Sequence, residues 1–237
     1  MSEVYWSILP ERSIGEYAFM ASMAVASRAG NMGYAYITSN CQRTDVARNR
    51  LAAAFRQVAT DPNDVLVMLD CDHAHPHDII ERLVSYEPAK GVVGALAFRR
   101  GEPYFPCFFM RGQDGVIRQP LQFTGELMRC TIVGTGAIAI RRWVLDAIAD
   151  AGYPAPFLYE YTDLMHQTGE YQSEDISFGF ICEKLGIPHY CDTGMVTPHL
   201  TTSAIDQSTW DLKVRQIRME SSAIQTIPNP EIQLVQE

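Results

Sequence analysis

The sequence predicts an α/β protein with a mostly parallel central sheet and flanking helices, and three observations support this. Short apolar runs alternate with longer amphipathic segments through the first half of the chain. One of these runs, residues 65–69, leads directly into the carboxylates Asp70 and Asp72. The chain has 237 residues, 47% of them hydrophobic, which is ample for one sizeable core. Alternation of strand and helix at this spacing is typical of βαβ units.

The elements of the first half follow from the period of the apolar residues. Short runs rich in β-branched and aromatic residues predict strands, and apolar residues at helical spacing predict helices. The expected strands are residues 4–9, 34–38, 65–70 and 91–98, and the expected helices are residues 15–29, 45–59 and 78–86. Because ligands bind at the carboxyl ends of such strands, Asn40 and the Asp70–Asp72 turn are expected to line one crevice.

The second half is less regular. Residues 99–129 are rich in glycine, proline and phenylalanine, which predicts hairpins and loops laid over the sheet. Ser173 is a suitable N-cap for a late helix. The further elements expected are a strand at 131–140, a helix at 142–151, a loop at 153–172, a helix at 174–185 and a short strand at 189–192. We expect one domain over residues 1–200, and a helical appendage with a polar tail over 201–237.

Composition narrows the classes of function. The formal net charge of −9 offers no basic surface for non-specific nucleic-acid binding and disfavours an anionic bilayer. No apolar run approaches the roughly 18 residues of a membrane span, so no transmembrane segment is expected. The six cysteines show no Cys-x-x-Cys spacing, which favours reduced thiols in a cytoplasmic protein.

The Asp-x-Asp pair is the strongest single signal. Both carboxylates follow a buried strand and can reach one hard cation, which then keeps coordination sites free for water or substrate phosphates. The alternative is a helix cap or an Asx-turn, since Asp often follows a strand for those reasons alone.

Taken in order, the motifs resemble those of the GT-A glycosyltransferases, in particular many bacterial and phage members. The resemblance spans roughly residues 4–200. The motifs that carry it are Asp-x-Asp at 70–72, TDVARN at 44–49, VGTGA at 133–137 with Arg141 and Arg142, and Glu174-Asp175 followed by Phe178, Gly186, Asp192 and His199. The resemblance implies a UDP- or GDP-sugar donor, with Mn²⁺ or Mg²⁺ held by Asp70 and Asp72 and often completed by a C-terminal His, here His199.

The chemistry of glycosyl transfer is consistent with these residue types. Transfer builds negative charge on the departing nucleoside diphosphate, and a divalent cation offsets that charge. Asp72 is the expected direct ligand, while Asp70 acts through water or on the ribose. A lone His is more often a structural residue, so His199 has that alternative reading.

The acidic start of the late helix is a candidate for the group that activates the acceptor. A helix N-terminus favours an ionised carboxylate, and a general base must be ionised, so Asp175, with Glu174 beside it, is the expected catalytic acid pair. Inverting members of the family use an acid in this position. Two alternatives remain: the acids only complement the helix dipole, or in a retaining enzyme Asp175 binds a sugar.

Further residues are expected around the donor. Asn40, Asp45 and Arg48 surround the start of the second helix, whose N-terminus can hold a diphosphate or nucleoside, and Arg48 offers an always-charged fork for phosphate. Arg48 could instead pair with Asp45 on the helix surface. Gly134-Thr135-Gly136 would let a sugar approach the backbone, or would permit close packing. The last candidates are cations near strand ends, which also serve solubility in loops: Arg43, Arg99 and Arg100.

Two other classes of function stay open. His73, His75 and His77 beside Asp72 suggest a zinc-dependent hydrolase, although Pro76 places them in a loop. A noncatalytic nucleotide-sugar or glycan-binding module is the other. For a transferase, the acceptor hydroxyl is open among a glycan, a lipid-linked glycan, a protein, a small molecule and a modified base in DNA, with DNA disfavoured by the acidity. An oligomer is compatible with the sequence.

Overall fold

The computed structural model describes residues 2–9, 15–41, 43–101, 104–159 and 173–201. The chain divides into a unit Met1–Leu200 and a unit Thr201–Glu237. Of the second unit only Thr201 is described, so the predicted helical appendage and polar tail lie outside the described residues. The same holds for residues 160–172 of the predicted loop before the late helix.

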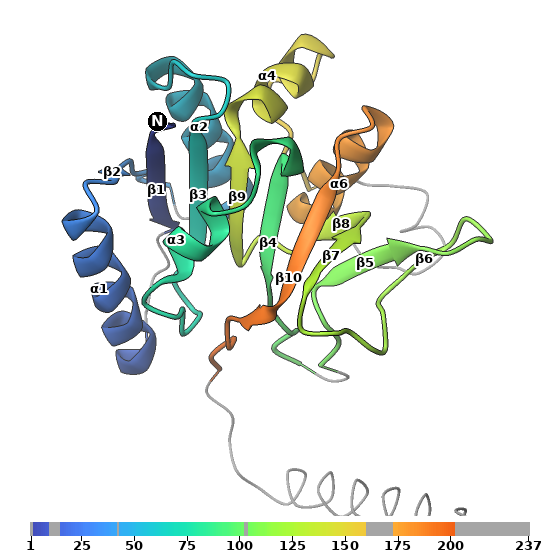
Figure 1. The fold of residues 1–237 in the computed structure, drawn as a ribbon, viewed down its shortest axis with the longest axis horizontal. Coiled ribbons are helices and arrows are strands. Elements are labelled where there is room, and N and C mark those ends of the chain that lie inside the picture. The colour runs from blue at the N-terminus through green and yellow to red at the C-terminus, as the bar shows by residue number, and fades with distance from the viewer. Residues whose placement is uncertain (1, 10–14, 42, 102–103, 160–172, 202–237) are drawn as a thin grey trace, which may run out of the picture. The chain divides into compact units, whose positions relative to one another are not determined.

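A seven-stranded sheet forms the centre of the first unit (Figure 1). Strands β9 and β7 run antiparallel to the other five, which are parallel to one another. In sheet order the strands are β2 (Ala35–Tyr36), β1 (Val4–Leu9), β3 (Val65–Asp70), β9 (Ala137–Arg141), β4 (Val92–Leu96), β10 (His189–Val196) and β7 (Leu127–Cys130). The predicted α/β class with a mostly parallel central sheet is confirmed.

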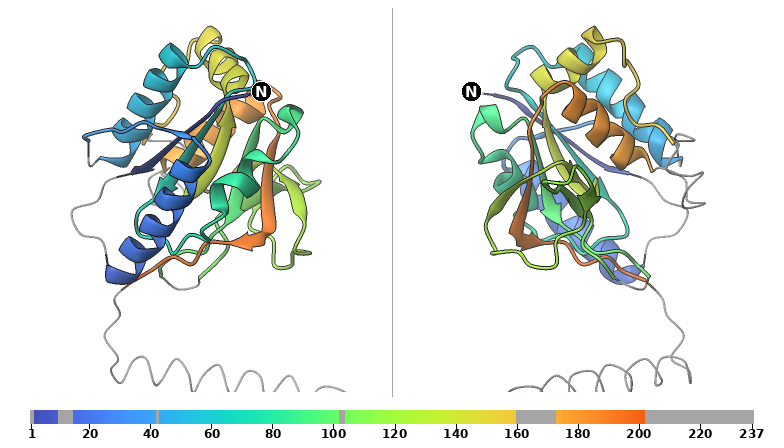
Figure 2. Two further views of the ribbon diagram at one scale, coloured as in Figure 1. Left: turned by 60° about the vertical axis from the view of Figure 1, so that its left-hand side comes forward. Right: turned by 90° about the vertical axis from the view of Figure 1, so that its right-hand side faces the viewer.

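Helices cover both faces of this sheet (Figure 2). One face carries α1 (Glu16–Asn31) and α3 (Ile79–Val84), and the other carries α2 (Thr44–Val58), α4 (Arg142–Asp150) and α6 (Glu174–Lys184). A short 3-10 helix, η1 (Pro88–Lys90), precedes β4. No helix in the described part of the chain is long and apolar enough to cross a membrane. No disulfide joins any of the six cysteines, all of which lie in the described residues.

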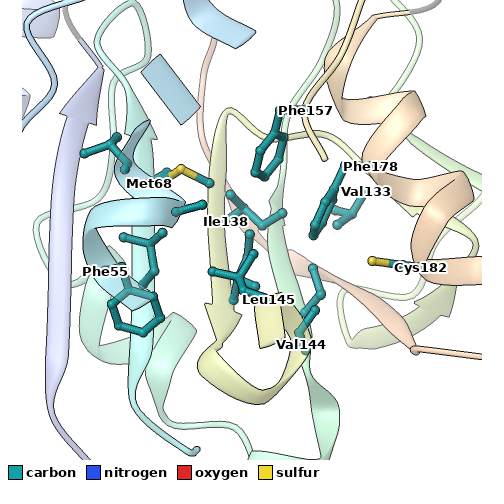
Figure 3. Packing of buried hydrophobic residues seen from close by; sticks show 14 of the residues in the cluster. Phe55, Met68, Val133, Ile138, Val144, Leu145, Phe157, Phe178 and Cys182 are labelled. Carbon is teal, nitrogen blue, oxygen red and sulfur yellow. The ribbon is translucent and has the colours of Figure 1, made fainter. Parts of the chain in front are cut away.

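The period of two along a strand explains how β3 serves both layers. Leu66 and Met68 point into the cluster beneath α2, α4 and α6, whereas Val67 and Leu69 point into the cluster beneath α1 and α3. Figure 3 shows the first cluster, in which Met68 and Ile138 of the sheet face side chains of the helices. The strand is therefore apolar on both faces, and its first charge, Asp70, comes where it leaves the core.

The prediction of a single strand at 131–140 is wrong, because residues Gly134–Gly136 interrupt it and divide it into two strands. Its first part, β8 (Ile132–Val133), joins a small second sheet with β5 (Phe108–Arg111) and β6 (Ile117–Arg118), and its last part is β9. At Gly134 the backbone crosses Cys107 so closely that a Cβ atom would lie 2.7 Å from the Cys107 carbonyl oxygen. The glycine therefore permits close backbone pairing with Cys107 just before the chain passes from the small sheet to the central one.

Two smaller expectations also need correction. The predicted strand at 189–192 continues to Val196, with a register irregularity between Asp192 and Val196. Ser173 precedes α6 but its side chain makes no cap hydrogen bond, because its hydroxyl is bonded to the Asp175 carboxylate instead.

His189 is a buried titratable group at the start of β10. It is 1% exposed, its ring lies 5.4 Å from that of Phe178, and neither ring nitrogen has a hydrogen-bond partner among the described residues. Burial lowers the pKa of His189 to about 3. The folded protein therefore holds this imidazole neutral, while the unfolded chain protonates it near its ordinary pKa of about 6.5.

We predict that this histidine weakens the fold in mild acid. A depressed histidine pKa means that the unfolded state binds the extra proton, so stability falls as the pH drops below about 6.5, by about 2 kcal/mol between about pH 7 and pH 5. His189→Met keeps the volume and removes the proton site. Urea unfolding should show a smaller loss between these pH values for the variant than for the natural protein, and equal losses would contradict the assignment.

Candidate active site

A pocket of about 340 Å³ opens at the carboxyl ends of β1, β3 and β4, the edge that the sequence predicted. Of the eleven residues predicted as catalytic, donor-binding or metal-binding, nine line it and two, Asn40 and Asp45, do not. Those that line it are Arg48, Asp70, Asp72, Gly134, Thr135, Gly136, Glu174, Asp175 and His199. Segments far apart in the sequence thus contribute to one cavity.

The two predicted residues outside the pocket lie at or just before the start of α2. Asn40 is exposed, and its side-chain oxygen accepts a hydrogen bond of 3.1 Å from Arg50. Asp45 is buried and accepts two bonds of 2.8 Å from Arg43. The alternative pairing of Asp45 with Arg48 is therefore not formed.

One wall of the pocket is formed by Arg48 together with Asp70, Thr135 and Glu174, and Arg48 lies at its centre. Its side chain is only 1% exposed, and its guanidinium has three sets of acceptors. It donates to both Asp70 oxygens at 2.7 and 3.0 Å, to the Thr135 carbonyl at 3.2 Å and to Glu174 at 3.2 Å. Burial lowers the pKa of Arg48, but the charges of Asp70 and Glu174 outweigh this and raise it. Each of the three guanidinium nitrogens thus donates to a protein acceptor.

Glu174 belongs to the same wall. Burial raises its pKa, and the charge of Arg48 opposes that effect without cancelling it. The hydroxyl of Tyr159 is also hydrogen-bonded to this carboxylate. Of the two acids that begin α6, Glu174 is thus held inside the structure.

Asp175 has a different setting. Its side chain is half-buried and lines the pocket. One of its oxygens, Oδ1, accepts hydrogen bonds from the Ser173 hydroxyl and, at 2.9 Å, from the backbone N–H of Ile176. These bonds orient the carboxylate at the N-terminus of α6, the positive end of the helix dipole.

The candidate metal ligands in the described part of the chain are Asp72, His73 and His199, whose ligand atoms lie within 4.8 Å of one another. Backbone pairing between the segment after β3 and the segment after β10 brings them together, with Ala74 donating to the Pro198 carbonyl and Leu200 to that of Asp72. The two imidazole rings stack with centroids 4.2 Å apart.

Both histidines are oriented by carbonyl groups. Nδ1 of His73 lies 3.1 Å from the Thr197 oxygen, and Nδ1 of His199 lies 3.0 Å from the Phe98 oxygen. Because a carbonyl only accepts, Nδ1 carries the hydrogen, and Nε2 of each ring is the atom directed at Asp72. A cation bound here would replace the hydrogen that Nε2 of His199 donates to Asp72, and would use the lone pair of each Nε2.

Asp72 is surrounded by positive or protonatable groups. Its Oδ2 lies 3.0 Å from Nε2 of His199 and 3.0 Å from Nη1 of Arg100. Burial raises its pKa, but the hydrogen bond from His199 and the charges of His199, His73 and Arg100 lower it to about 2. The carboxylate is therefore ionised and ready to bind a cation at neutral pH.

The structure changes the predicted ligand set in one respect. Asp70, expected among the metal residues, points to Arg48 and is not in the cluster, whereas His73 is. The signal for His73 was its position directly after Asp72, but its stacking on His199 depends on tertiary pairing. Gly136 makes room for it, since a Cβ atom there would lie 2.8 Å from the His73 ring.

The alternative in which His73, His75 and His77 converge on one zinc ion is not formed, in keeping with the loop expected from Pro76. The rings of His73 and His75 stack at 5.5 Å, but Nε2 of His75 is bonded at 2.7 Å to the backbone oxygen of Asp70. His77 is exposed and lies outside the pocket lining. Only His73 of the three therefore contributes to the candidate metal site.

Solved structures similar to this chain include two glycosyltransferases and a synthase. A Drosophila β-1,4-galactosyltransferase 7 mutant, in complex with manganese, UDP-Gal and xylobiose, is 12% identical, with a TM-score of 0.43 over 88% of this chain and 79% of that one. A glycosyltransferase involved in glycosylation of the major capsid of PBCV-1 is 11% identical, with a TM-score of 0.42 over 93% and 100%.

The third is a 4-diphosphocytidyl-2C-methyl-D-erythritol synthase, 13% identical, with a TM-score of 0.41 over 90% of this chain and 98% of that one. No protein-family model and no curated protein sequence matches the chain.

We predict that Arg48→Met destabilises the protein by about 3–5 kcal/mol, because removing one partner of a buried ion pair leaves carboxylates without compensation. Arg48→Lys should recover part of the loss, since it keeps the charge but not the fork. The measurement is urea unfolding. Arg118→Gln is the control, because Arg118 pairs with Asp114 on the exposed surface and its loss should leave the midpoint unchanged. Equal midpoints for Arg48→Met and the natural protein would refute the structural role.

Proposed function

We propose that the chain is a metal-dependent glycosyltransferase, which moves a sugar from a nucleotide-diphosphate sugar to an acceptor hydroxyl. The observation that carries this proposal is the joint placement of the cluster Asp72, His73 and His199 and the helix-start carboxylate Asp175 in the lining of one pocket. Such a pocket combines a cation site for phosphates with a base for the acceptor.

The donor set fits a divalent cation such as Mn²⁺. Two imidazole nitrogens and one carboxylate suit Mn²⁺ and zinc-like ions better than Mg²⁺, which prefers oxygen ligands. Asp72, His73 and His199 would hold the ion, and the carbonyls behind the two rings already fix their orientation. When bound, the cation offsets the negative charge that develops on the leaving nucleoside diphosphate.

The remaining work falls to the protein's own residues. Asp175 takes the proton of the acceptor hydroxyl as the hydroxyl oxygen bonds to the anomeric carbon and the bond to the diphosphate breaks. Arg48 keeps the wall behind it rigid, because it holds both Asp70 and Glu174. The two acids of α6 thus take separate roles, one catalytic and one positional.

A zinc-dependent hydrolase is the second candidate, and one observation favours it. Two histidines and an aspartate with open positions also form a suitable catalytic zinc site, where bound water attacks the substrate. Tight zinc binding, with hydrolysis in the absence of any nucleotide sugar, would support this alternative. Nucleoside-diphosphate release that depends on an acceptor would exclude it.

We predict that a nucleotide sugar stabilises the protein only together with Mn²⁺. In a thermal-shift screen of UDP- and GDP-sugars, the matching donor at about 100 times its Kd should add about 2.7 kcal/mol. Asp72→Asn should abolish the Mn²⁺-dependent part, and His73→Ala and His199→Ala should weaken it, because each loses a ligand atom.

His77→Ala is the matched control, since that exposed histidine lies outside the cluster. Its response to Mn²⁺ should equal that of the natural protein. Full Mn²⁺ dependence in Asp72→Asn would remove Asp72 from the ligand set, and the absence of any response to every donor would refute the proposed function.

We predict that Asp175→Asn keeps donor binding and loses transfer by about 10²–10⁴-fold, because an amide cannot accept the acceptor's proton. Asn still accepts the hydrogen bond of the Ile176 N–H, so α6 should begin as before. Nucleoside-diphosphate release with an identified acceptor measures transfer, and calorimetry measures donor affinity.

Glu183→Gln serves as the control for this charge change, because Glu183 lies near the other end of the same helix and pairs with Arg111. Its turnover should equal that of the natural protein. Near-normal turnover in Asp175→Asn would reduce Asp175 to a structural role, and joint loss of binding and turnover would place it in the donor site.

A further inference from the structure

Arg100 is a cation in the pocket that the proposed reaction has not used. It follows β4, its side chain is 51% exposed, and it lines the pocket beside the candidate metal ligands. Its Nη1 lies 3.0 Å from Oδ2 of Asp72. Arg99, its neighbour in sequence, is also exposed but does not line the pocket.

The pocket offers a phosphate only one accessible guanidinium among its described lining residues. These residues include two arginines and no lysine, and the other arginine is Arg48. Arg48 is buried and its donors are occupied by Asp70, Thr135 and Glu174. A diphosphate that enters the pocket therefore meets Arg100 and not Arg48.

Arg100 and a bound cation would compete for the same oxygen. Oδ2 of Asp72 already faces both Arg100 and His199. A divalent ion on Asp72 would place positive charge next to the guanidinium and repel it. The Arg100 side chain is half exposed and so is free to change rotamer, whereas His199 is fixed by the Phe98 carbonyl.

We propose that Arg100 exchanges partners during donor binding: it neutralises Asp72 in the metal-free protein and binds the diphosphate oxygens of the donor once a cation occupies Asp72. This inference rests on the proposed function and deepens it. The planar fork of a guanidinium matches phosphate oxygens, which a flexible ammonium does less well. Cation binding and diphosphate binding are then coupled through one side chain.

This coupling predicts that substitution of Arg100 affects Mn²⁺ affinity and nucleotide affinity differently. Arg100→Gln removes both the competitor for Asp72 and the partner of the phosphate. Affinity for Mn²⁺ alone should therefore stay equal or rise, while affinity for UDP or GDP at saturating Mn²⁺ should fall about tenfold or more, as expected for a lost charged hydrogen bond. Arg100→Lys should show an intermediate loss of nucleotide affinity.

Calorimetry with Mn²⁺ alone, and with UDP and GDP in the presence of Mn²⁺, tests this inference. Arg99→Gln is the matched control, because it removes the same charge one residue away and outside the pocket, and its nucleotide affinity should change by less than about twofold. Equal losses in the two variants would overturn the inference in favour of a general charge effect. Unchanged nucleotide affinity in Arg100→Gln, or weaker binding of Mn²⁺ alone, would also overturn it.

These outcomes separate the two proposals. If the natural protein binds neither nucleotide with Mn²⁺, the proposed function fails and the partner exchange fails with it. If it binds one of them and Arg100→Gln binds equally well, only the partner exchange fails. Matching thermal midpoints for the variants and the natural protein show that the fold is unaffected.

Discussion

The site depends on the ion pairs that the buried guanidinium of Arg48 makes with Asp70 and Glu174. A charge removed from water must be compensated, and here Asp70, Glu174 and the Thr135 carbonyl provide the compensation. These groups come from the end of β3, the turn between β8 and β9, and the start of α6. One side chain of α2 therefore ties three distant segments to the edge of the sheet.

This tie divides the acidic residues of the pocket into two kinds. Asp70 and Glu174 are both held by Arg48, whose single positive charge offsets part of their negative charge. Asp72 and Asp175, each next to one of the held acids in sequence, line the pocket outside the Arg48 network. Carboxylates one or two residues apart in sequence thus take different partners, because only one of each pair reaches Arg48.

The cation site depends on a second constraint, which is backbone pairing across the sheet edge. The segment 72–74 and the segment 198–200 exchange hydrogen bonds, and this places the rings of His73 and His199 against each other. Carbonyls of Thr197 and Phe98 then decide which ring nitrogen faces Asp72. The orientation of the candidate ligands is thus set before any ion binds.

Most of the fold could be predicted from the sequence, because strand and helix periods are local properties of the chain. The apolar runs determined the strands of the first half, and the Asp-x-Asp pair determined which edge of the sheet carries the site. The break at Gly134–Gly136 could not be predicted, because it arises where the chain crosses Cys107, a contact between distant residues. The membership of Asp72 and His199 in one cluster was expected from the motif order.

The exchange of Asp70 for His73 in the candidate metal site was decided by tertiary structure. Asp70 and Asp72 look equivalent in the sequence, and only the buried Arg48 distinguishes them by drawing Asp70 into the wall. The positions of Asn40 and Asp45 outside the pocket were decided in the same way, by Arg50 and Arg43. Residue types and their order are written in the sequence, but which charge pairs with which depends on burial and on contacts between distant segments.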